Sequence, residues 1–133
     1  MNLLEALAKV VPEEWGASLV PGTEDAPWGL LLMNQTVKNL PGEAVISICL
    51  QANDRYNAEA LILLLDELRA KGYLWQITPS DRREGYVIDV WRQPTLSERV
   101  LDTYERVFDA HCLTLIECAV RAFIAAKANE EKT

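Results

Sequence analysis

The sequence is poor in the residues on which most catalytic and metal sites depend. Among 133 residues there is one histidine, His111, and there are three cysteines: Cys49, Cys112 and Cys118. No two cysteines have the spacing of a zinc or iron–sulfur site, and a single histidine argues against a transition-metal site within the chain. The six glycines stand apart from one another, so there is no glycine-rich phosphate loop. The sequence therefore predicts no catalytic residue, no metal and no cofactor.

Any Ser–His or Cys–His mechanism would have to use His111. Cys112 is its neighbour, but adjacent residues on a helix point about 100° apart, so the two side chains do not face each other. We therefore expect His111 at the edge of the core or in an interface. We expect all three cysteines to be buried free thiols in a reducing cytosol.

Strong positive charge and long apolar runs are also absent. The net charge of −7 and the pI near 4.7 disfavour binding to bulk nucleic acid or to anionic membranes. Glu5 and Lys9 interrupt the short apolar stretch at the beginning, which argues against a secretory signal. The richest apolar run, 112–126, carries Glu117 and Arg121 and is too short and too charged to span a bilayer. We expect a cytoplasmic protein.

Hydrophobic periodicity predicts the order helix, three strands, helix, two strands, helix. Asn2 and Asn57 are expected to cap the first two helices, and Gly72 to end the second in a left-handed conformation. These elements predict one α+β domain over 1–133, with one mostly antiparallel sheet of about five strands covered by helices. The predicted ranges are 3–11, 15–20, 28–33, 44–50, 58–71, 73–78, 86–91 and 95–128.

The last predicted helix, 95–128, is unusually long. Thr95 and Glu98 fit a capping box, and neither glycine nor proline follows Pro94. Such a helix would measure about 45–50 Å, whereas a compact domain of this length is only about 35–40 Å across. The helix must therefore bend, break or find a second chain.

The second half of this helix is apolar around more than one side, which is typical of a helix buried on several sides. Glu117 and Arg121 stand four residues apart, in the order that favours an ion pair. We expect a homodimer or a higher symmetric oligomer. The candidate interface residues are Leu115, Ile116, Ala119, Val120, Phe123 and Ile124.

The late hairpin is a second candidate site. Arginine forks beside aromatic rings suit a nucleotide or another phosphate-bearing anion. The alternative is that strands are naturally rich in aromatic residues and that the charged tip is simply solvated. The candidate ligand-binding residues are Arg82, Arg83, Arg92, Trp75, Tyr86 and Trp91.

Carboxylates mark two further places. Asp89 falls in the middle of a strand, where we expect it to be half exposed or to pair with an arginine across the hairpin. Four others fall on one stripe of the predicted long helix, where they could hold a hard divalent cation or a basic partner, or form a solvated face. They are Glu98, Asp102, Glu105 and Asp109.

Three functions compete at this point. We favour a small non-enzymatic interaction protein that associates with itself through its last helix. The alternative is a binder that sequesters an anionic, nucleotide-like molecule, such as a phage or mobile-element accessory or inhibitor protein. A metal-dependent carboxylate enzyme ranks third, because no pair of titratable groups has a spacing that requires it.

Overall fold

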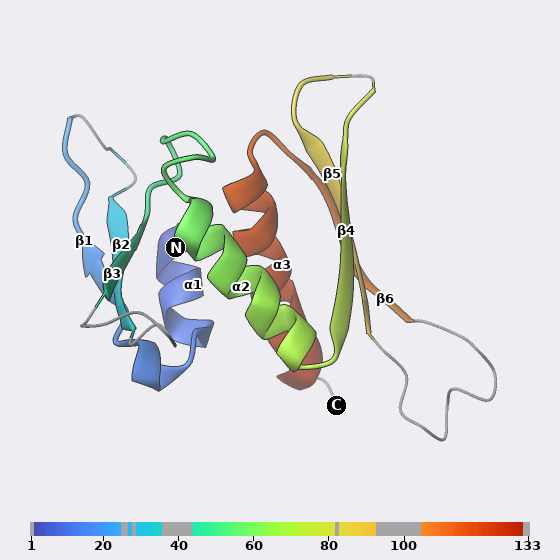
Figure 1. The fold of residues 1–133 in the computed structure, drawn as a ribbon, viewed down its shortest axis with the longest axis horizontal. Helices are drawn as coiled ribbons and strands as arrows, with labels where there is room; N and C mark the ends of the chain where they lie inside the picture. The colour runs from blue at the N-terminus through green and yellow to red at the C-terminus, as the bar shows by residue number, and fades with distance from the viewer. Residues whose placement is uncertain are drawn as a thin grey trace.

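In the part of the chain that the structure describes, a layer of helices lies between two three-stranded antiparallel sheets (Figure 1). The computed structural model describes residues 2–24, 27, 29–35, 44–81, 83–92 and 105–131. The elements are α1 (Leu3–Val10), the 3-10 turn η1 (Glu13–Trp15), β1 (Ser18–Val20), β2 (Leu30–Gln35), β3 (Ala44–Ile48), α2 (Ala58–Ala70), β4 (Tyr73–Pro79), β5 (Tyr86–Arg92), β6 (Glu105–Cys112) and α3 (Leu115–Glu131).

Sheet A has the strand order β1-β2-β3, and sheet B has the order β4-β5-β6. The predicted α+β class is confirmed, but the prediction of one sheet of about five strands is wrong. Helix α2 leads from sheet A across the helical layer, and β4 then starts a new sheet instead of joining β3 (Figure 1). Two sheets can form because a single layer of helices offers an apolar surface on each of its two sides.

The predicted helix 95–128 is wrong over residues 105–112, and residues 95–104 lie outside the described part of the chain. Residues Glu105–Cys112 form β6, and helix α3 begins only at Leu115. The segment fits a strand because Phe108, Ala110 and Cys112 alternate with polar residues and pack toward the core. The predicted capping box of Thr95 and Glu98 lies outside the described residues.

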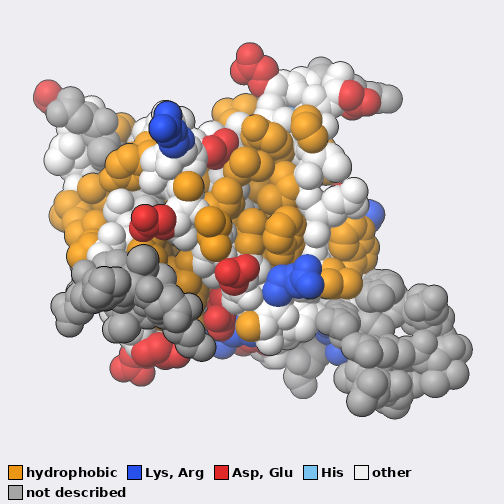
Figure 2. Space-filling view, viewed as in Figure 1, with side chains coloured by type: hydrophobic (Ala, Val, Ile, Leu, Met, Phe, Trp, Pro, Cys, Tyr) orange, Lys and Arg blue, Asp and Glu red, His pale blue; other side chains and the backbone are white. Residues whose placement is uncertain are grey.

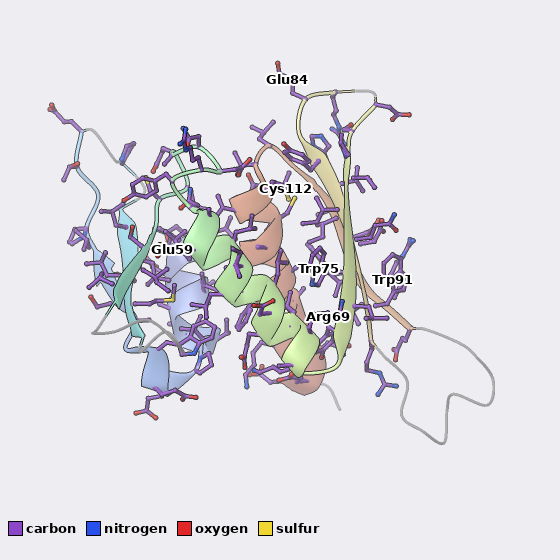
Figure 3. The ribbon with its side chains drawn as sticks, viewed as in Figure 1. Glu59, Arg69, Trp75, Glu84, Trp91 and Cys112 are labelled. Carbon is purple, nitrogen blue, oxygen red and sulfur yellow. The ribbon has the colours of Figure 1, made fainter. Side chains whose placement is uncertain are left out.

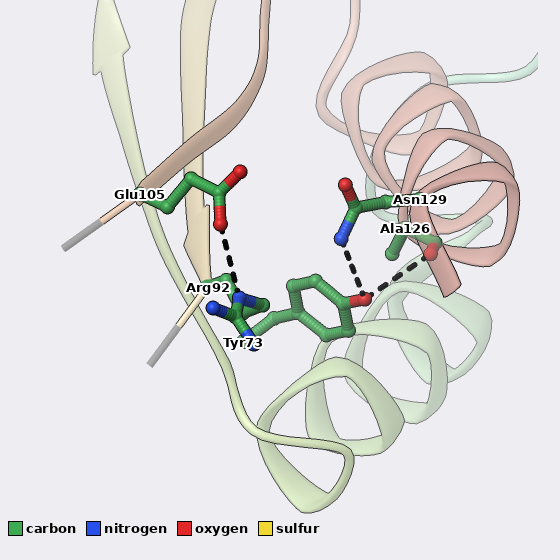
Figure 4. Close-up of polar contacts among 5 residues, drawn as sticks. All are labelled: Tyr73, Arg92, Glu105, Ala126 and Asn129. Atoms are coloured by element: carbon green, nitrogen blue, oxygen red, sulfur yellow. Dashed lines mark hydrogen bonds and ion pairs between the residues drawn. The ribbon is translucent and has the colours of Figure 1, made fainter. Parts of the chain in front are cut away.

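Helix α3 runs through the middle of the domain and packs against α1, α2 and sheet B (Figure 1). Its 17 residues measure about 25 Å, so it fits inside a domain of this size and the length argument for a second chain no longer applies. The hydroxyl of Tyr73 on β4 donates to the backbone oxygen of Ala126 at 3.2 Å and accepts from Asn129 at 3.4 Å (Figure 4). The expected Glu117–Arg121 ion pair is confirmed at 2.9 Å.

Two predicted helix ends are confirmed. Asn2 accepts a hydrogen bond from the backbone N–H of Glu5 at 2.9 Å and caps α1. Gly72 follows α2 with a φ of 93°.

No described helix combines enough length with enough apolar character to cross a membrane.

The loop between β3 and α2 is organised by Asn57, which is fully buried. Asn57 stands at the N-cap position of α2, but the prediction that its side chain caps the helix is wrong. The side chain turns back instead. Its oxygen accepts from the N–H of Cys49, and its nitrogen donates to the oxygen of Cys49, both at 2.9 Å. The bonds hold the loop closed, and Asp54 projects from it to the start of α3.

Candidate functional site

The aromatic residues of the late hairpin lie on opposite faces of sheet B. Trp75 and Tyr86 pack against the core, because paired residues of antiparallel strands share a face and theirs faces the helices. Trp91 follows the buried Val90 and therefore points outward. Figure 3 shows Trp75 on the helix side of β4 and Trp91 on the far side. The three rings do not line a common pocket.

The arginines of the same prediction are also separated. Arg83 is exposed at the tip of the hairpin, and Arg82 lies outside the described residues. Arg92 is at the other end of β5, which spans about 20 Å at about 3.3 Å per residue. There its Nε donates to the carboxylate of Glu105 at 3.2 Å (Figure 4). The structure therefore does not bring the described arginines of the predicted anion site together.

The predicted oligomer interface lies inside the protomer. Ile116, Ala119 and Val120 are fully buried, and Phe123 is only 2% exposed. Leu115 and Ile124 are half-buried, and Ile124 packs against the same core. The apolar character of α3 is thus explained by contacts within one chain, because sheet B and two helices surround it.

The predicted carboxylate stripe is not a helical stripe. Glu105 and Asp109 belong to β6, and Glu98 and Asp102 lie outside the described residues. No group of three or more histidine, cysteine, aspartate or glutamate side chains within the described ranges is placed to hold a metal ion.

Two thiols meet where β6 passes into α3. Cys112 ends β6, and Cys118 lies in the first turns of α3; both are buried (Figure 3 labels Cys112). A hydrogen bond from the Cys118 thiol lowers the pKa of Cys112. The same bond and burial raise the pKa of Cys118 far above its usual range. Because such buried thiols are poorly accessible, we interpret the pair as part of the core, which agrees with the predicted free thiols.

His111 cannot work together with Cys112, because neighbouring residues of a strand point to opposite faces. His111 faces outward beside Val87, and Cys112 faces the core. The Nε2 atom of His111 and the Nε1 atom of Trp75 are both buried without a described hydrogen-bond partner. They lie on opposite faces of sheet B, so they do not form one polar site.

The outer face of sheet B carries several charged and polar side chains. Asp89 lies there next to Arg106, with 3.4 Å between the carboxylate and the guanidinium, and the Asp89 side chain is 23% exposed. Asp89 thus has an arginine partner, but the partner comes from the neighbouring strand β6 and not from across the hairpin as predicted. Asp109 is directly opposite Asp89, and Gln76 and Thr78 are exposed on the same face. Leu74, Val87 and Trp91 also face outward and are half-buried, so the apolar-inside, polar-outside alternation of a half-solvated sheet is kept only in part.

The outer face of sheet A breaks this alternation. Leu31 and Met33 on β2 are buried against the helices, so the residues between and before them, Leu32 and Leu30, point outward and are half-buried. Val45 on β3 is 60% exposed. Figure 2 shows apolar side chains along the side of the molecule that sheet A forms. No charged residue occurs among the described outward residues, which are Ser18, Val20, Leu30, Leu32, Val45 and Ser47.

A tyrosine lies beside this face. The hydroxyl of Ser47 donates to the hydroxyl of Tyr56 at 3.0 Å, and the tyrosine is 54% exposed. Tyrosine is enriched in protein–protein interfaces because its ring is apolar while its hydroxyl can be satisfied. We take the outer face of sheet A, with Tyr56, as the candidate functional surface.

Sequence reasoning missed this surface, although a signal for it was present. The runs 30–33 and 44–50 are apolar at odd and even positions alike, which is typical of strands covered on both faces. In the structure the helices cover only one face of these strands. The two runs also fit strands that are buried on both faces within one domain, and the last helix was the segment predicted to contact a partner.

Comparison of the chain with protein-family models, with curated proteins and with solved structures finds no match.

Proposed function

We propose that this chain is a non-enzymatic interaction protein that associates with itself through the outer face of sheet A. The observation that carries the proposal is the uncharged, apolar character of the described part of that face, where Val45 on β3 is 60% exposed and the neighbouring strand β2 holds the outward Leu30 and Leu32. Covering apolar surface stabilises an assembly by about 25 cal/mol per Å² removed from water. The outer face of sheet B also carries apolar side chains, but covering it would remove Asp89, Arg106 and Asp109 from water.

Charge favours a second copy as the partner. The chain carries a net charge of −7, so two copies repel each other wherever their acidic surfaces meet. An uncharged face lets them approach without placing like charges in contact. A two-fold symmetric contact needs a surface that is complementary to itself, and an apolar sheet face meets this condition.

The geometry favours an interaction protein over an anion-binding protein or a metal-dependent enzyme. The described arginines proposed for an anionic ligand lie at opposite ends of β5, and Arg92 pairs with Glu105. His111 and Cys112 lie on opposite faces of β6. Glu105 and Asp109 both lie on β6, where Glu105 pairs with Arg92 of β5 and both carboxylates are exposed, which suits a solvated surface.

The experiment is a measurement of mass in solution by light scattering over a range of concentrations. The wild-type chain is expected to shift from one protomer to a dimer as concentration rises. Val45→Lys should remain a single protomer, since each copy would bring a lysine into the contact. Thr78→Lys is the matched control, because it adds the same charge at an exposed strand position of sheet B, and it should dimerise as the wild type does.

Two results would count against the proposal. One is a folded wild-type chain that stays a single protomer at every concentration. The other is an equal loss of dimer in Val45→Lys and Thr78→Lys, which would indicate a general charge effect. A thermal shift with nucleotides that disappears in Arg83→Ala would favour the ligand-binding alternative instead.

A further inference from the structure

The edge strands of the two sheets differ in how well they are protected against pairing with another chain. Natural proteins protect an exposed edge with charges, proline, bulges or very short strands. In sheet B, β6 carries Glu105, Arg106 and Asp109, and its register with β5 is interrupted between Val90 and Trp91. The other edge strand, β4, ends in Pro79 and turns polar side chains to solvent. In sheet A, β1 has only three residues.

Within the described residues, strand β3 has none of these protections. It is the second edge strand of sheet A in the described order, and its five residues, AVISI, include no charge and no proline. It pairs with β2 in one continuous register without a bulge. Val45, Ile46 and Ile48 are β-branched, so the strand has a high intrinsic preference for extended structure. The outward side chain of Val45 is largely exposed, as in edge strands that pair with another chain.

From this contrast we propose that β3 pairs antiparallel with β3 of a second copy of the chain, so that two A sheets join edge to edge across a two-fold axis. The inference rests on the proposed self-association, but it places the contact at the β3 edge, so that the outer faces of the two A sheets lie side by side and not against each other. Pairing of backbone N–H and C=O groups across the new edge is the ordinary way in which one strand adds to another sheet.

A second copy of the chain is the favoured partner because β3 is complementary to another β3. In an antiparallel pair centred on Ile46, Val45 of one copy lies opposite Ser47 of the other, so no charged residue meets another. The outer faces of the two A sheets then become one continuous apolar surface, with Tyr56 and its bond to Ser47 beside the junction. A strand from an unrelated basic protein would find no carboxylate on β3 to recognise.

Hydrogen–deuterium exchange, measured with light scattering on the same samples, tests the geometry. The full chain is compared well below and well above the concentration at which the mass doubles. Pairing at β3 predicts that amides of residues 44–48 exchange more slowly in the dimer, because edge N–H groups become hydrogen-bonded. Amides of β4, an uncharged edge strand of sheet B, should exchange at the same rate in both samples.

A matched pair of variants gives a second readout. Ser47→Lys adds to the edge strand a residue that blocks such pairing, and it should raise the dimer dissociation constant about tenfold or more. Ser47→Thr keeps the hydroxyl and adds a β-branch, and it should leave the constant within about threefold of wild type. Circular dichroism on both variants establishes that each is folded.

The outcomes separate the two proposals. A dimer with slowed exchange at 44–48 supports pairing at β3. A dimer without slowed exchange there overturns it and leaves self-association through the sheet face standing. A chain that never dimerises overturns both. Slowed exchange at β4 in place of β3 would move the joining edge to sheet B and also contradict the inference.

Discussion

Asp54 and Leu115 are 61 residues apart in sequence, and a hydrogen bond joins them. One carboxylate oxygen of Asp54 accepts from the backbone N–H of Leu115 at 3.0 Å and from that of Ile116 at 3.4 Å. The first N–H groups of a helix have no partner within the helix, so the loop after β3 supplies the acceptor for α3. The negative charge also lies at the positive end of the helix dipole. The contact links the sheet A half of the chain to the last helix.

Removing this cap should destabilise the whole domain, since α3 lies at its centre. Asp54→Ala is expected to lower the free energy of unfolding by about 1–2 kcal/mol, the usual range for a lost helix cap. Urea denaturation followed by circular dichroism measures it. Asp66→Ala, an exposed carboxylate on α2, is the control and should change stability by less than about 0.5 kcal/mol. Equal effects of the two substitutions would show that Asp54 has no special role.

Substitutions of Gly85 and Gly72 should separate the cost of backbone strain from the added cost of a steric clash. Both glycines have positive φ angles, 103° and 93°, which side chains disfavour. A Cβ at Gly85 would overlap the backbone carbonyl of Cys112, whereas a Cβ at Gly72 meets nothing within 4 Å. Gly72→Ala should therefore cost about 1–2 kcal/mol from strain alone. Gly85→Ala should cost about 3 kcal/mol or more, because the turn must also move away from β6.

Thermal and urea unfolding of both glycine variants give the comparison. A Gly85→Ala variant that is as stable as Gly72→Ala would contradict the close approach of the hairpin to the end of β6.

The thiols should differ in their reaction with a bulky disulfide reagent. Cys49 is half-buried, whereas Cys112 and Cys118 are buried and share a hydrogen bond. The folded chain is expected to react rapidly at Cys49 alone, and all three thiols should react once the chain is unfolded. Absorbance of the released thiolate counts them. Cys49→Ser should abolish the rapid phase, and a rapid phase that survives this substitution would contradict the burial of the pair.

Much of the local structure was predictable because it depends on short-range spacing. The Asn2 cap, the positive φ of Gly72 and the Glu117–Arg121 pair all follow from residues no more than four positions apart. The run Glu105–Cys112 was misread because it lacks glycine and proline, so nothing in it forbids a helix. Its true alternation appears only once Phe108, Ala110 and Cys112 have a core to face.

The candidate site was harder to predict, since a residue pattern reports that a face is apolar without saying what covers it. The α3 residues Ile116, Val120 and Phe123 and the β2 residues Leu30 and Leu32 are all apolar in sequence. Only the arrangement of the layers shows that the first set is enclosed and the second faces outward.

The sequence by itself determined the α+β class, the positions of most helices and strands, the acidic charge and the scarcity of catalytic side chains. Those properties depend on composition and on contacts within a few residues. The tertiary structure alone decided that the strands divide into two sheets, that Asp54 caps α3 and that the open apolar face belongs to sheet A. These three features depend on which distant segments pack against the single layer of helices, and only the packing of the whole chain determines that.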